Sequence, residues 1–553
     1  MHMAFDVYKK WTYYFILGLM AASLPLSRYF MSVSQFSLVV IWLAEGMDIN
    51  RIAAAPKKER LRAIFSELGS SVAIQVKRFA RNRPAVIFAS IYLMHILGSA
   101  FASDFHHMLA DLRVKLPLLS LPVLFPGLQR LGKKEVYNLL SIHALAVFGG
   151  TLVTIYMYLS TGETEYRDLF PYFSHIRFSL NAVLAIFNLG YLFLKTNHFK
   201  GPVKAAGGGI AIWIILFLFT FKSFTGIVIF LIVTGFILIA LVLRTRNNLL
   251  RIPFLLIIVA IPATLIWMGV TSYKSLTQAP APDFGQLDKK TARGNPYKHD
   301  TVLYKIENGE YVGLYICKKE LKQAWNKRSE IPFDSLDRKN QRLKHTLVRY
   351  LASKDLRKDA AGVNALSKKD INHIENGIAN VKYTQLFSVK TRIEKIVMGY
   401  LHYKRKNDPS GNSVMQRIEY WKASAGLIRQ HPVLGIGTGN MKTAFTEQYK
   451  RMNTKLDEKF RHRSHNQFLF ITVAYGFIGL LWFLFALLYP PYLRGGYKMF
   501  LFNLFMGIAF LSMLYEDTLE RQAGVTFVSF FFTVYLLAYT SKSANTSNHC
   551  KEK

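Results

Sequence analysis

Long apolar blocks separated by polar segments recur toward both ends of the chain. About 20 consecutive apolar residues suffice for a helix to cross a bilayer, and about twelve blocks approach that length. Hydrophobicity that comes in blocks, instead of at the period of a strand or an amphipathic helix, predicts an all-α polytopic membrane protein. The spans are expected to begin near Trp11, Ser32, Pro84, Val114, Asn138, Phe178, Gly208, Gly226 and Ile252, and then near Gln467, Met499 and Val525.

Basic residues concentrate in every second short loop. Short loops rich in Lys and Arg face the cytoplasm in membrane proteins, whereas long loops are exempt from this rule. Both termini are therefore expected in the cytoplasm, and the long hydrophilic segment is expected on the far side of the membrane. The basic loops lie within residues 51–83, 133–134, 195–204, 244–251 and 494–498.

The long hydrophilic segment has the pattern of a folded domain. Glu307-Asn-Gly-Glu310 lies between two β-prone runs and predicts a β-hairpin, because Asn-Gly accepts positive φ. Ser367 begins a predicted helix, and helical patterns at 343–351, 391–403 and 414–429 predict a mainly helical domain. The chain is thus divided into a membrane domain of about nine spans at 1–271, a loop domain at 272–464, three further spans at 465–541 and a cytoplasmic tail at 542–553.

The net charge of the 553 residues is +36. In a soluble protein such a charge would suggest a nucleic-acid partner. The sequence contains no basic motif interleaved with aromatic residues of the RNA-binding kind, so nucleic acid is not an expected partner. The excess charge lies mostly in the short loops, where it sets orientation, and in the long loop.

His465 and Asn466 lie at the outer mouth of the tenth predicted span. Histidine is the natural general base near neutral pH and can take a proton from a sugar hydroxyl. The alternative is a capping or interfacial histidine, which the position alone does not exclude. His462 is three residues away, but no carboxylate or cysteine lies beside the pair at ligand spacing, so no metal site is expected.

Arg417 and Lys222 are two further candidates, each a cation that could bind an anion. Arg417 and Trp421 are four residues apart and share one face of a predicted helix. Lys222 precedes Ser223 in a very short loop at the membrane boundary, where a lysine either extends to the interface or meets an anionic headgroup. The glycine run from Gly435 to Asn440 follows no strand, which excludes a Rossmann site, so it forms either a phosphate loop or a tight turn that packs on the membrane domain.

One motif resembles that of a known family. His465-Asn466, nine residues, Gly476, two residues and Gly479 is similar to the pattern of the O-antigen ligase and polymerase superfamily. The order of the elements is also similar to that of this superfamily. Nine spans are followed by one large loop, and then a His-Asn pair opens the next span. This topology covers most of the chain.

Other segments carry the same resemblance. Residues 417–437 resemble the loop segment of the family, residues 111–117 resemble its fourth-span start, and residues 311–329 resemble the longer loops of Bacteroidetes-type members. The family has Ser-Arg before the eighth span, whereas this chain has Ser223-Phe224. Lys222 is the candidate for replacing that missing cation.

The resemblance implies a type C (GT-C-like) glycosyltransferase of the bacterial inner membrane with a periplasmic active site. Its donor would be a polyprenyl-pyrophosphate-linked glycan among the membrane lipids, and its acceptor a hydroxyl of lipid A-core. His465 would be the base, with Arg417 and Lys222 on the pyrophosphate and with Asn466, Ser223 and Trp421 in support. No cofactor or metal is implied. Polymerisation of repeat units and transfer to protein hydroxyls remain alternatives within the family, and a transporter or a structural scaffold remains outside it.

Overall fold

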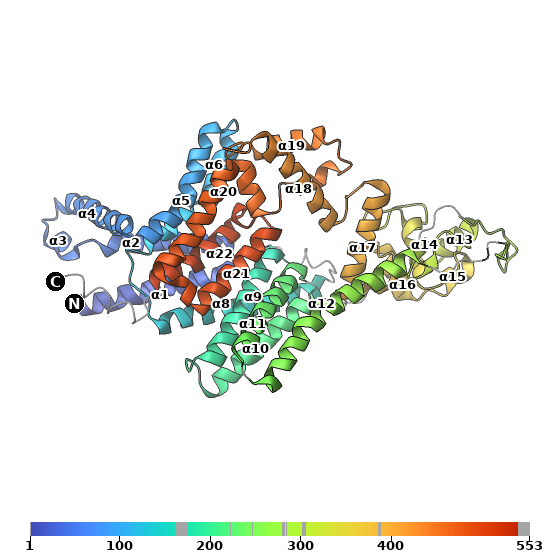
Figure 1. The fold of residues 1–553 in the computed structure, drawn as a ribbon, viewed down its shortest axis with the longest axis horizontal. Coiled ribbons are helices and arrows are strands. Elements are labelled where there is room, and N and C mark those ends of the chain that lie inside the picture. The colour runs from blue at the N-terminus through green and yellow to red at the C-terminus, as the bar shows by residue number, and fades with distance from the viewer. Residues whose placement is uncertain are drawn as a thin grey trace. The chain divides into compact units, whose positions relative to one another are not determined.

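The computed structural model describes residues 2–161, 170, 174–221, 223–245, 247–278, 283, 285–300, 306–384 and 389–539. The chain forms two compact units. The first comprises Met1–Ile237 and Gln416–Lys553, and the second comprises Leu238–Met415. Each unit is mainly helical, and Figure 1 traces the elements in chain order.

The first unit is built from helices that begin before and resume after the second unit. In chain order its α-helices are α1 (His2–Leu26), α2 (Arg28–Glu45), α3 (Ile49–Ala54), α4 (Arg60–Arg81), α5 (Arg83–Gly98), α6 (Phe105–Lys115), α7 (Pro117–Leu124), α8 (Lys133–Thr161), α9 (His175–Lys195), α10 (Gly201–Thr220), most of α11 (Phe224–Arg244) and of α18 (Ser413–Gln430), α19 (Met441–Arg451), α20 (Gln467–Arg494), α21 (Phe500–Tyr515) and α22 (Gln522–Thr533). Short 3₁₀ helices connect them, namely η1 (Ser99–Phe101), η3 (Glu458–Phe460), η4 (Gly496–Lys498) and η5 (Thr518–Glu520), and a π-helical segment, η6 (Val534–Ala538), extends α22.

Seven helices within the described residues are long and apolar enough to cross a membrane. They coincide with the third predicted span and with the fifth to the tenth, which confirms a helical, multi-pass membrane protein. The last two predicted spans correspond to the shorter apolar helices α21 and α22 with η6. The seven are Arg83–Phe101, Lys133–Thr161, His175–Lys195, Gly201–Thr220, Phe224–Arg244, Arg251–Thr277 and Gln467–Arg494.

The fourth predicted span, near Val114, does not form one long helix. The chain there forms α6 and then α7, which has only 8 residues. The interruption falls at Leu116, whose backbone angles are still helical (φ −49°, ψ −34°). Pro117 lacks an N–H and so cannot continue the hydrogen-bond ladder of α6. Asp111 and Lys115 in α6 also make that stretch polar.

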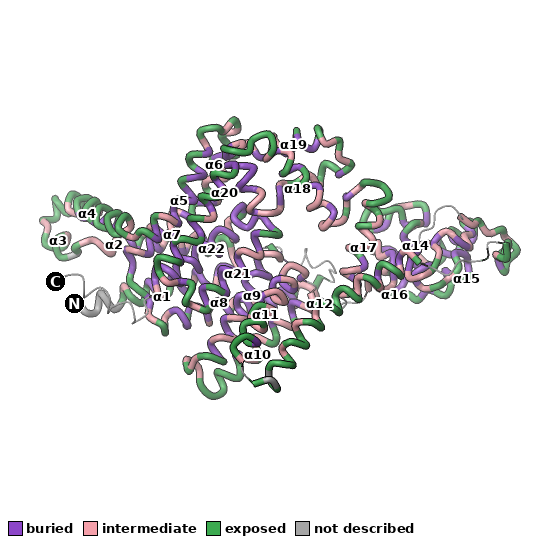
Figure 2. Tube along the Cα trace, in the orientation of Figure 1, coloured by how far each residue is buried: buried purple, intermediate pink, exposed green. Residues whose placement is uncertain are grey.

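The centre of the first unit is a packed aromatic and aliphatic core. Phe88 of α5 stacks on Phe532 of α22 with ring centroids 3.9 Å apart, and both side chains are fully buried. Phe505 of α21 packs against the same helix. Figure 2 shows the buried positions following α5, α20 and α22 through this region. A rigid core thus holds the ends of these helices in fixed positions.

Helix α20 is broken at Gly476, where φ is 64° and ψ is −169°. The break frees backbone groups that the glycine run satisfies. Ile436 N–H donates to Val473 O (3.0 Å), Gly437 N–H donates to Ala474 O (2.8 Å), and Phe477 N–H donates to Pro432 O (2.8 Å). Non-helical backbone at membrane depth is tolerated where protein covers it in this way.

The glycine run is therefore a tight turn against the membrane helices, one of the two interpretations that the sequence left open. Gly435, Gly437 and Gly439 all have positive φ, which side chains with a Cβ rarely adopt. A Cβ at Gly435 would meet the Ala474 carbonyl carbon at 2.4 Å. Thr438 adds hydrogen bonds to the backbone of α5.

Gly476→Ala is expected to lower the free energy of unfolding by about 1–3 kcal/mol, the usual cost of a strained backbone position. A Cβ there would lie 2.0 Å from Val433 O, so the turn at 432–438 would also have to move. Thermal unfolding of the detergent-purified protein measures the effect. Gly507→Ala is the control, because a Cβ at Gly507 meets nothing within 4 Å. Equal melting temperatures for the two variants would contradict this account of the break.

The second unit joins a membrane helix to a small helical domain. Its elements are α12 (Asn248–Thr277), β1 (Ile306–Glu307), β2 (Glu310–Tyr311), α13 (Lys318–Asn326), α14 (Leu343–Ser353), α15 (Ala360–Asn364), α16 (Lys368–Glu375), η2 (Val381–Thr384) and α17 (Val389–Lys406). The buried side chains of Trp325 and Tyr350 lie in its own core. The second unit therefore has a hydrophobic core separate from that of the first.

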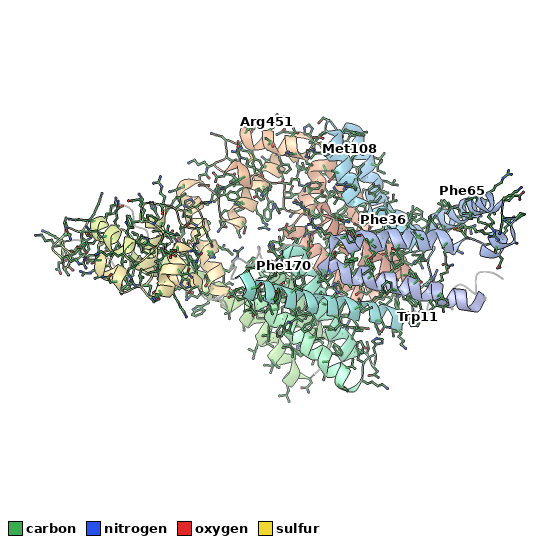
Figure 3. The ribbon with its side chains drawn as sticks, turned by 180° about the vertical axis from the view of Figure 1, so that it is seen from behind. Trp11, Phe36, Phe65, Met108, Phe170 and Arg451 are labelled. Atoms are coloured by element: carbon green, nitrogen blue, oxygen red, sulfur yellow. The ribbon has the colours of Figure 1, made fainter. Side chains whose placement is uncertain are left out.

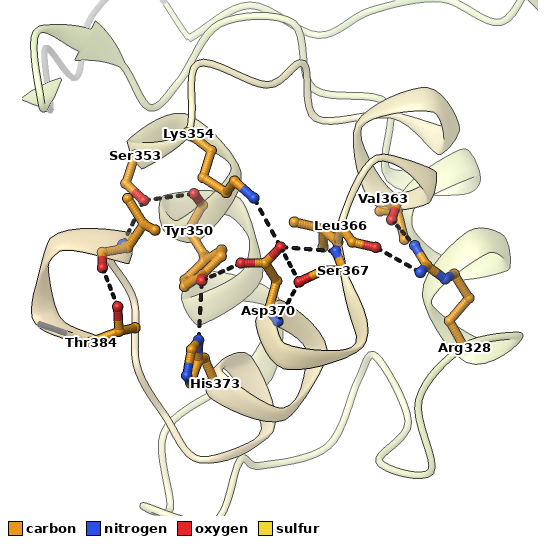
Figure 4. A network of polar contacts seen from close by, with 11 residues as sticks. Arg328, Tyr350, Ser353, Lys354, Val363, Leu366, Ser367, Asp370, His373 and Thr384 are labelled. Carbon is orange, nitrogen blue, oxygen red and sulfur yellow. Dashed lines mark hydrogen bonds and ion pairs between the residues drawn. The ribbon is translucent and has the colours of Figure 1, made fainter.

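Local predictions for this unit are confirmed. β1 and β2 pair antiparallel around Asn308 and Gly309, both with positive φ, although residues 301–305 of the predicted first strand lie outside the described residues. Ser367 caps α16 in a capping box with Asp370. Figure 4 shows that Asp370 also accepts hydrogen bonds from Tyr350 and Lys354. The domain is thus fixed by capping and by a polar network.

Candidate active site

His465 lies on the short segment that leads into α20. Its φ is +45°, a left-handed conformation that is uncommon for residues other than glycine and that is often found at functional sites. Its Nδ1 lies 3.1 Å from Oε2 of Glu516, and its ring stacks on Tyr420 of α18 with centroids 5.3 Å apart. The side chain of His465 is 30% exposed. The ring is therefore fixed on one side and accessible on the other.

Glu516 follows α21 and contacts two of the predicted site residues at once. Its Oε1 accepts from Nη2 of Arg417 at 2.7 Å, and its Oε2 faces His465. The Glu516 side chain is only 7% exposed. Burial opposes its ionisation, but the hydrogen bond from His465 and the charges of His465, Arg177 and Arg417 prevail and lower the pKa of Glu516 to about 2. Glu516 is thus an ionised carboxylate shared by a histidine and an arginine.

This pairing determines which nitrogen of His465 can act as a base. A carboxylate accepts hydrogen bonds, so in the neutral form of the ring Nδ1 carries the proton toward Glu516 and Nε2 has the lone pair. Nε2 has no hydrogen-bond partner within the described part of the chain. The same division of roles orients the histidine in hydrolase triads. The geometry can therefore take a proton from a hydroxyl at Nε2.

Arg417 lies in the first turns of α18. Besides Glu516, its Nε donates to the carbonyl oxygen of Tyr515 at 3.3 Å, so two of its donors face the end of α21. The Arg417 side chain is 20% exposed. The structure thus brings Arg417 and His465, 48 positions apart in the sequence, onto opposite oxygens of one carboxylate.

Asn466 has a clear structural role. Its side chain caps α20 by accepting from Leu469 N–H at 3.0 Å and donates to Leu514 O at 3.1 Å. Its backbone N–H donates to Asp517 at 2.9 Å. Asn466 therefore ties the start of α20 to the end of α21 and to Asp517. These contacts hold His465 against the Glu516–Asp517 turn.

Trp421 and Ser223 do not join this cluster. Trp421 is 40% exposed and makes none of the ring or hydrogen-bond contacts found within the described residues. Ser223 is buried at the start of α11 and bonds to Ser179 of α9. Lys222 lies outside the described residues. The structure thus joins Arg417, His465 and Asn466 and places Trp421 and Ser223 elsewhere.

A buried ion network lies beside the site. Nζ of Lys115 donates to Glu520 and to Asp111, each at 2.7 Å, and both the Lys115 and Glu520 side chains are fully buried. Arg463, two residues before His465, also pairs with Glu520 at 3.4 Å. Buried ion pairs contribute little net stability but are costly to break. This network therefore fixes the segment that carries His465 relative to α6 and the turn after α21.

Arg177 of α9 is a second cation that faces the Glu516–Asp517 turn. Its Nη2 donates to Asp517 O at 3.1 Å, and its charge helps to lower the pKa of Glu516. The residue is 6% exposed, and its Nε and Nη1 have no hydrogen-bond partner among the described residues. Arg177 thus neutralises the acidic turn from the side of the membrane helices.

Sequence reasoning did not name Glu516, Arg177 or Tyr420 as site residues. The available signal was a short loop with three acids, Glu516, Asp517 and Glu520, which the expected topology places on the same side of the membrane as His465. Arg177 is a cation close to the start of a predicted span, which in a membrane protein is itself a signal of function. No three His, Cys, Asp or Glu side chains in the described ranges are placed to hold a metal ion.

The protein is thus a helical, multi-pass membrane protein. In its first unit, a cluster of arginine, glutamate and histidine lies at the ends of the helices. Residues 377–484 match the model of a known family, O-Antigen ligase. The match confirms the resemblance to the O-antigen ligase and polymerase superfamily and includes Arg417, His465, Asn466 and Gly476. No curated protein matches the chain.

Proposed function

We propose that the protein is a GT-C-like glycosyltransferase that moves a polyprenyl-pyrophosphate-linked glycan onto an acceptor hydroxyl, with lipid A-core as the acceptor. The observation that carries the proposal is the pair of contacts made by Glu516, to Arg417 at 2.7 Å and to His465 at 3.1 Å. One carboxylate thereby holds a candidate base next to a candidate anion-binding cation. The match of residues 377–484 to the O-antigen ligase family supports this class of reaction.

His465 is proposed to act as the general base. Its Nε2 takes the proton of the acceptor hydroxyl as that oxygen attacks the anomeric carbon of the donor glycan. The bond from the anomeric carbon to the pyrophosphate oxygen breaks, and the polyprenyl pyrophosphate leaves with the electron pair. Glu516 stabilises the imidazolium that results, as the acid of a catalytic triad does.

Arg417 is proposed to bind the departing pyrophosphate. A guanidinium has five N–H donors in a fixed fork, so one arginine can contact Glu516 and a phosphate together. Lys222 is proposed as a second cation at the membrane boundary, in the place where the family has arginine. Fixed cations stabilise the charge that develops on the leaving group, so this reaction needs no metal.

The active site is proposed to face the periplasm, with about twelve spans in the inner membrane and both termini in the cytoplasm. A reporter fused after Asn340 is then expected to be periplasmic, and one fused after Arg60 is expected to be cytoplasmic. Paired alkaline phosphatase and fluorescent-protein fusions measure both positions. A fusion after Asn340 that reports the cytoplasm, with fluorescence and without phosphatase activity, would overturn this topology.

The identity of the acceptor is tested by the glycans of cells that lack the protein. Lipid A-core without O-chains is the result expected for the proposed ligase. Chains limited to one repeat unit would instead establish a polymerase, and unglycosylated protein would establish transfer to protein hydroxyls. Unchanged glycans together with a transport defect would favour a transporter.

A further inference from the structure

Helix α4 packs against the neighbouring helices of the first unit through a polar face. Glu67, Ser71 and Gln75 recur every four residues and are buried. Ser71 Oγ donates to Leu43 O at 2.6 Å, and Gln75 Nε2 donates to Trp42 O at 3.2 Å. The face of α4 that contacts protein is therefore mostly polar, and Phe79 in the last turn adds an apolar contact with the core.

A neighbouring face of α4 is apolar and uncovered. Leu61 is 71% exposed, Phe65 69% and Val76 48%, and Val72 lies on the same face. At 100° per residue these four side chains fall within an arc of about 60°. Figure 3 labels Phe65 at the outer edge of the helix. This apolar stripe requires an occupant, because contiguous exposed apolar surface marks an interaction site.

The same segment is strongly basic. Residues 49–83 contain nine Lys or Arg and two Glu, which gives a net charge of +7. Basic side chains such as Arg62, Lys77 and Arg81 lie outside the arc of the apolar stripe. An apolar stripe with basic flanks is typical of helices that lie on anionic membranes.

The chain itself places α4 at a membrane boundary. α4 ends at Arg81, and an apolar span begins at Arg83, with only Asn82 between them. The last turn of α4 therefore lies where the span meets the lipid headgroups. This position favours lipid over a soluble protein as the occupant.

A polar cavity of about 320 Å³ adjoins α4 and provides a place for a headgroup. Lys9, Lys10 and Arg78 line it together with Glu45, which pairs with Lys9 at 2.8 Å. Tyr13, which is 2% exposed, also lines it, and its buried hydroxyl has no hydrogen-bond partner among the described residues. Three cations and an unpaired buried hydroxyl suit a phosphate group.

We propose that α4 and this cavity form a binding site for anionic phospholipid in the leaflet at the N-terminal end of α5. The apolar stripe inserts at the boundary between headgroups and acyl chains, and the cavity takes the phosphate of one lipid. The site lies apart from the arginine–glutamate–histidine cluster and does not depend on the proposed transferase activity. It would anchor the ends of α1, α2 and α5 on an anionic leaflet.

The position of α4 can be measured in the full chain by spin labels in a background of Cys317→Ser and Cys550→Ser. One label is attached at Phe65→Cys on the stripe and the other at Ser70→Cys, which is exposed on another face. In vesicles that contain phosphatidylglycerol, the label at 65 is expected to be accessible to oxygen and the label at 70 to a water-soluble nickel complex. Equal nickel accessibility of the two labels would overturn the proposal, and so would shielding of the label at 65 from both reagents, which means a protein occupant.

The cavity is tested by the phosphatidylglycerol retained by the purified protein in native mass spectrometry. Lys10→Gln removes a cation of the cavity without breaking an ion pair among the described residues and is expected to weaken retention about fivefold. Lys200→Gln, an exposed lysine outside the cavity, is the control and should retain wild-type lipid. Unchanged retention in Lys10→Gln would overturn the cavity assignment, and displacement of the lipid by inorganic phosphate would assign the cavity to free phosphate instead.

Discussion

His465→Gln is expected to reduce glycan transfer by about 10²–10⁴-fold, the usual contribution of a positioned general base. Glutamine can keep a hydrogen bond to Glu516 but cannot accept the proton of the acceptor hydroxyl. Binding of the pyrophosphate donor should survive the change, because the proposed contacts to the donor come from cations. Transfer and donor binding are measured separately on the purified protein with a polyprenyl-pyrophosphate glycan.

His462→Ala is the control for this change. Its ring lies 5.8 Å from that of His465, but it has no contact with Glu516 in the described structure. Burial first, and then the charges of His465, Arg521 and Arg463, lower the pKa of His462, so it is mostly neutral at pH 7. Its loss should change transfer little. Near wild-type transfer by correctly folded His465→Gln would assign the base to another residue.

Arg417→Ala is expected to reduce transfer by about 10²–10³-fold, the range found when one stabilising donor of developing charge is removed. Arg417→Lys should rescue little, because Nε and Nη2 of the guanidinium contact Tyr515 and Glu516 at the same time and a lysine presents a single point of charge. Arg429→Ala, an exposed arginine in the last turn of the same helix, is the matched control. The measured quantities are the turnover rate and the donor concentration at half-maximal rate.

A double-mutant cycle separates two roles of Arg417. If Arg417 acts only by holding Glu516, its removal should cost little further in a Glu516→Gln background. If it binds the donor, as proposed, the loss of donor affinity should persist in that background. A full loss of the Arg417 effect in Glu516→Gln would therefore contradict pyrophosphate binding by this residue.

Features set by neighbouring residues were predictable from the sequence. Asn308-Gly309 specified a turn, Ser367 with Asp370 specified a helix start, and block hydrophobicity specified seven of the expected spans. These signals act over a few residues, so no tertiary information is needed. The fourth predicted span is interrupted at Leu116, and the average apolar content of that segment did not indicate the interruption.

The site was only half predictable, for a different reason. His465 and Arg417 belong to recognisable local patterns, but Glu516 lies 51 positions after His465 and reaches it only because α20 and α21 run side by side. Trp421 shares a helix with Arg417, and helical spacing indicated a common face, yet Trp421 is exposed. Periodicity specifies which residues share a face and does not specify what that face meets.

The break in α20 has a consequence for how the protein is made. A helix entering lipid with unpaired groups near Gly476 would incur several kcal/mol for each of them. The segment from Pro432 to Thr438, which pairs with those groups, emerges from the ribosome before α20 does, and so does α5, to which Thr438 bonds. The segment that pairs with α20 is thus synthesised before α20 itself. We therefore expect that α20 reaches its native form only once the segment 432–438 is in place to pair with it.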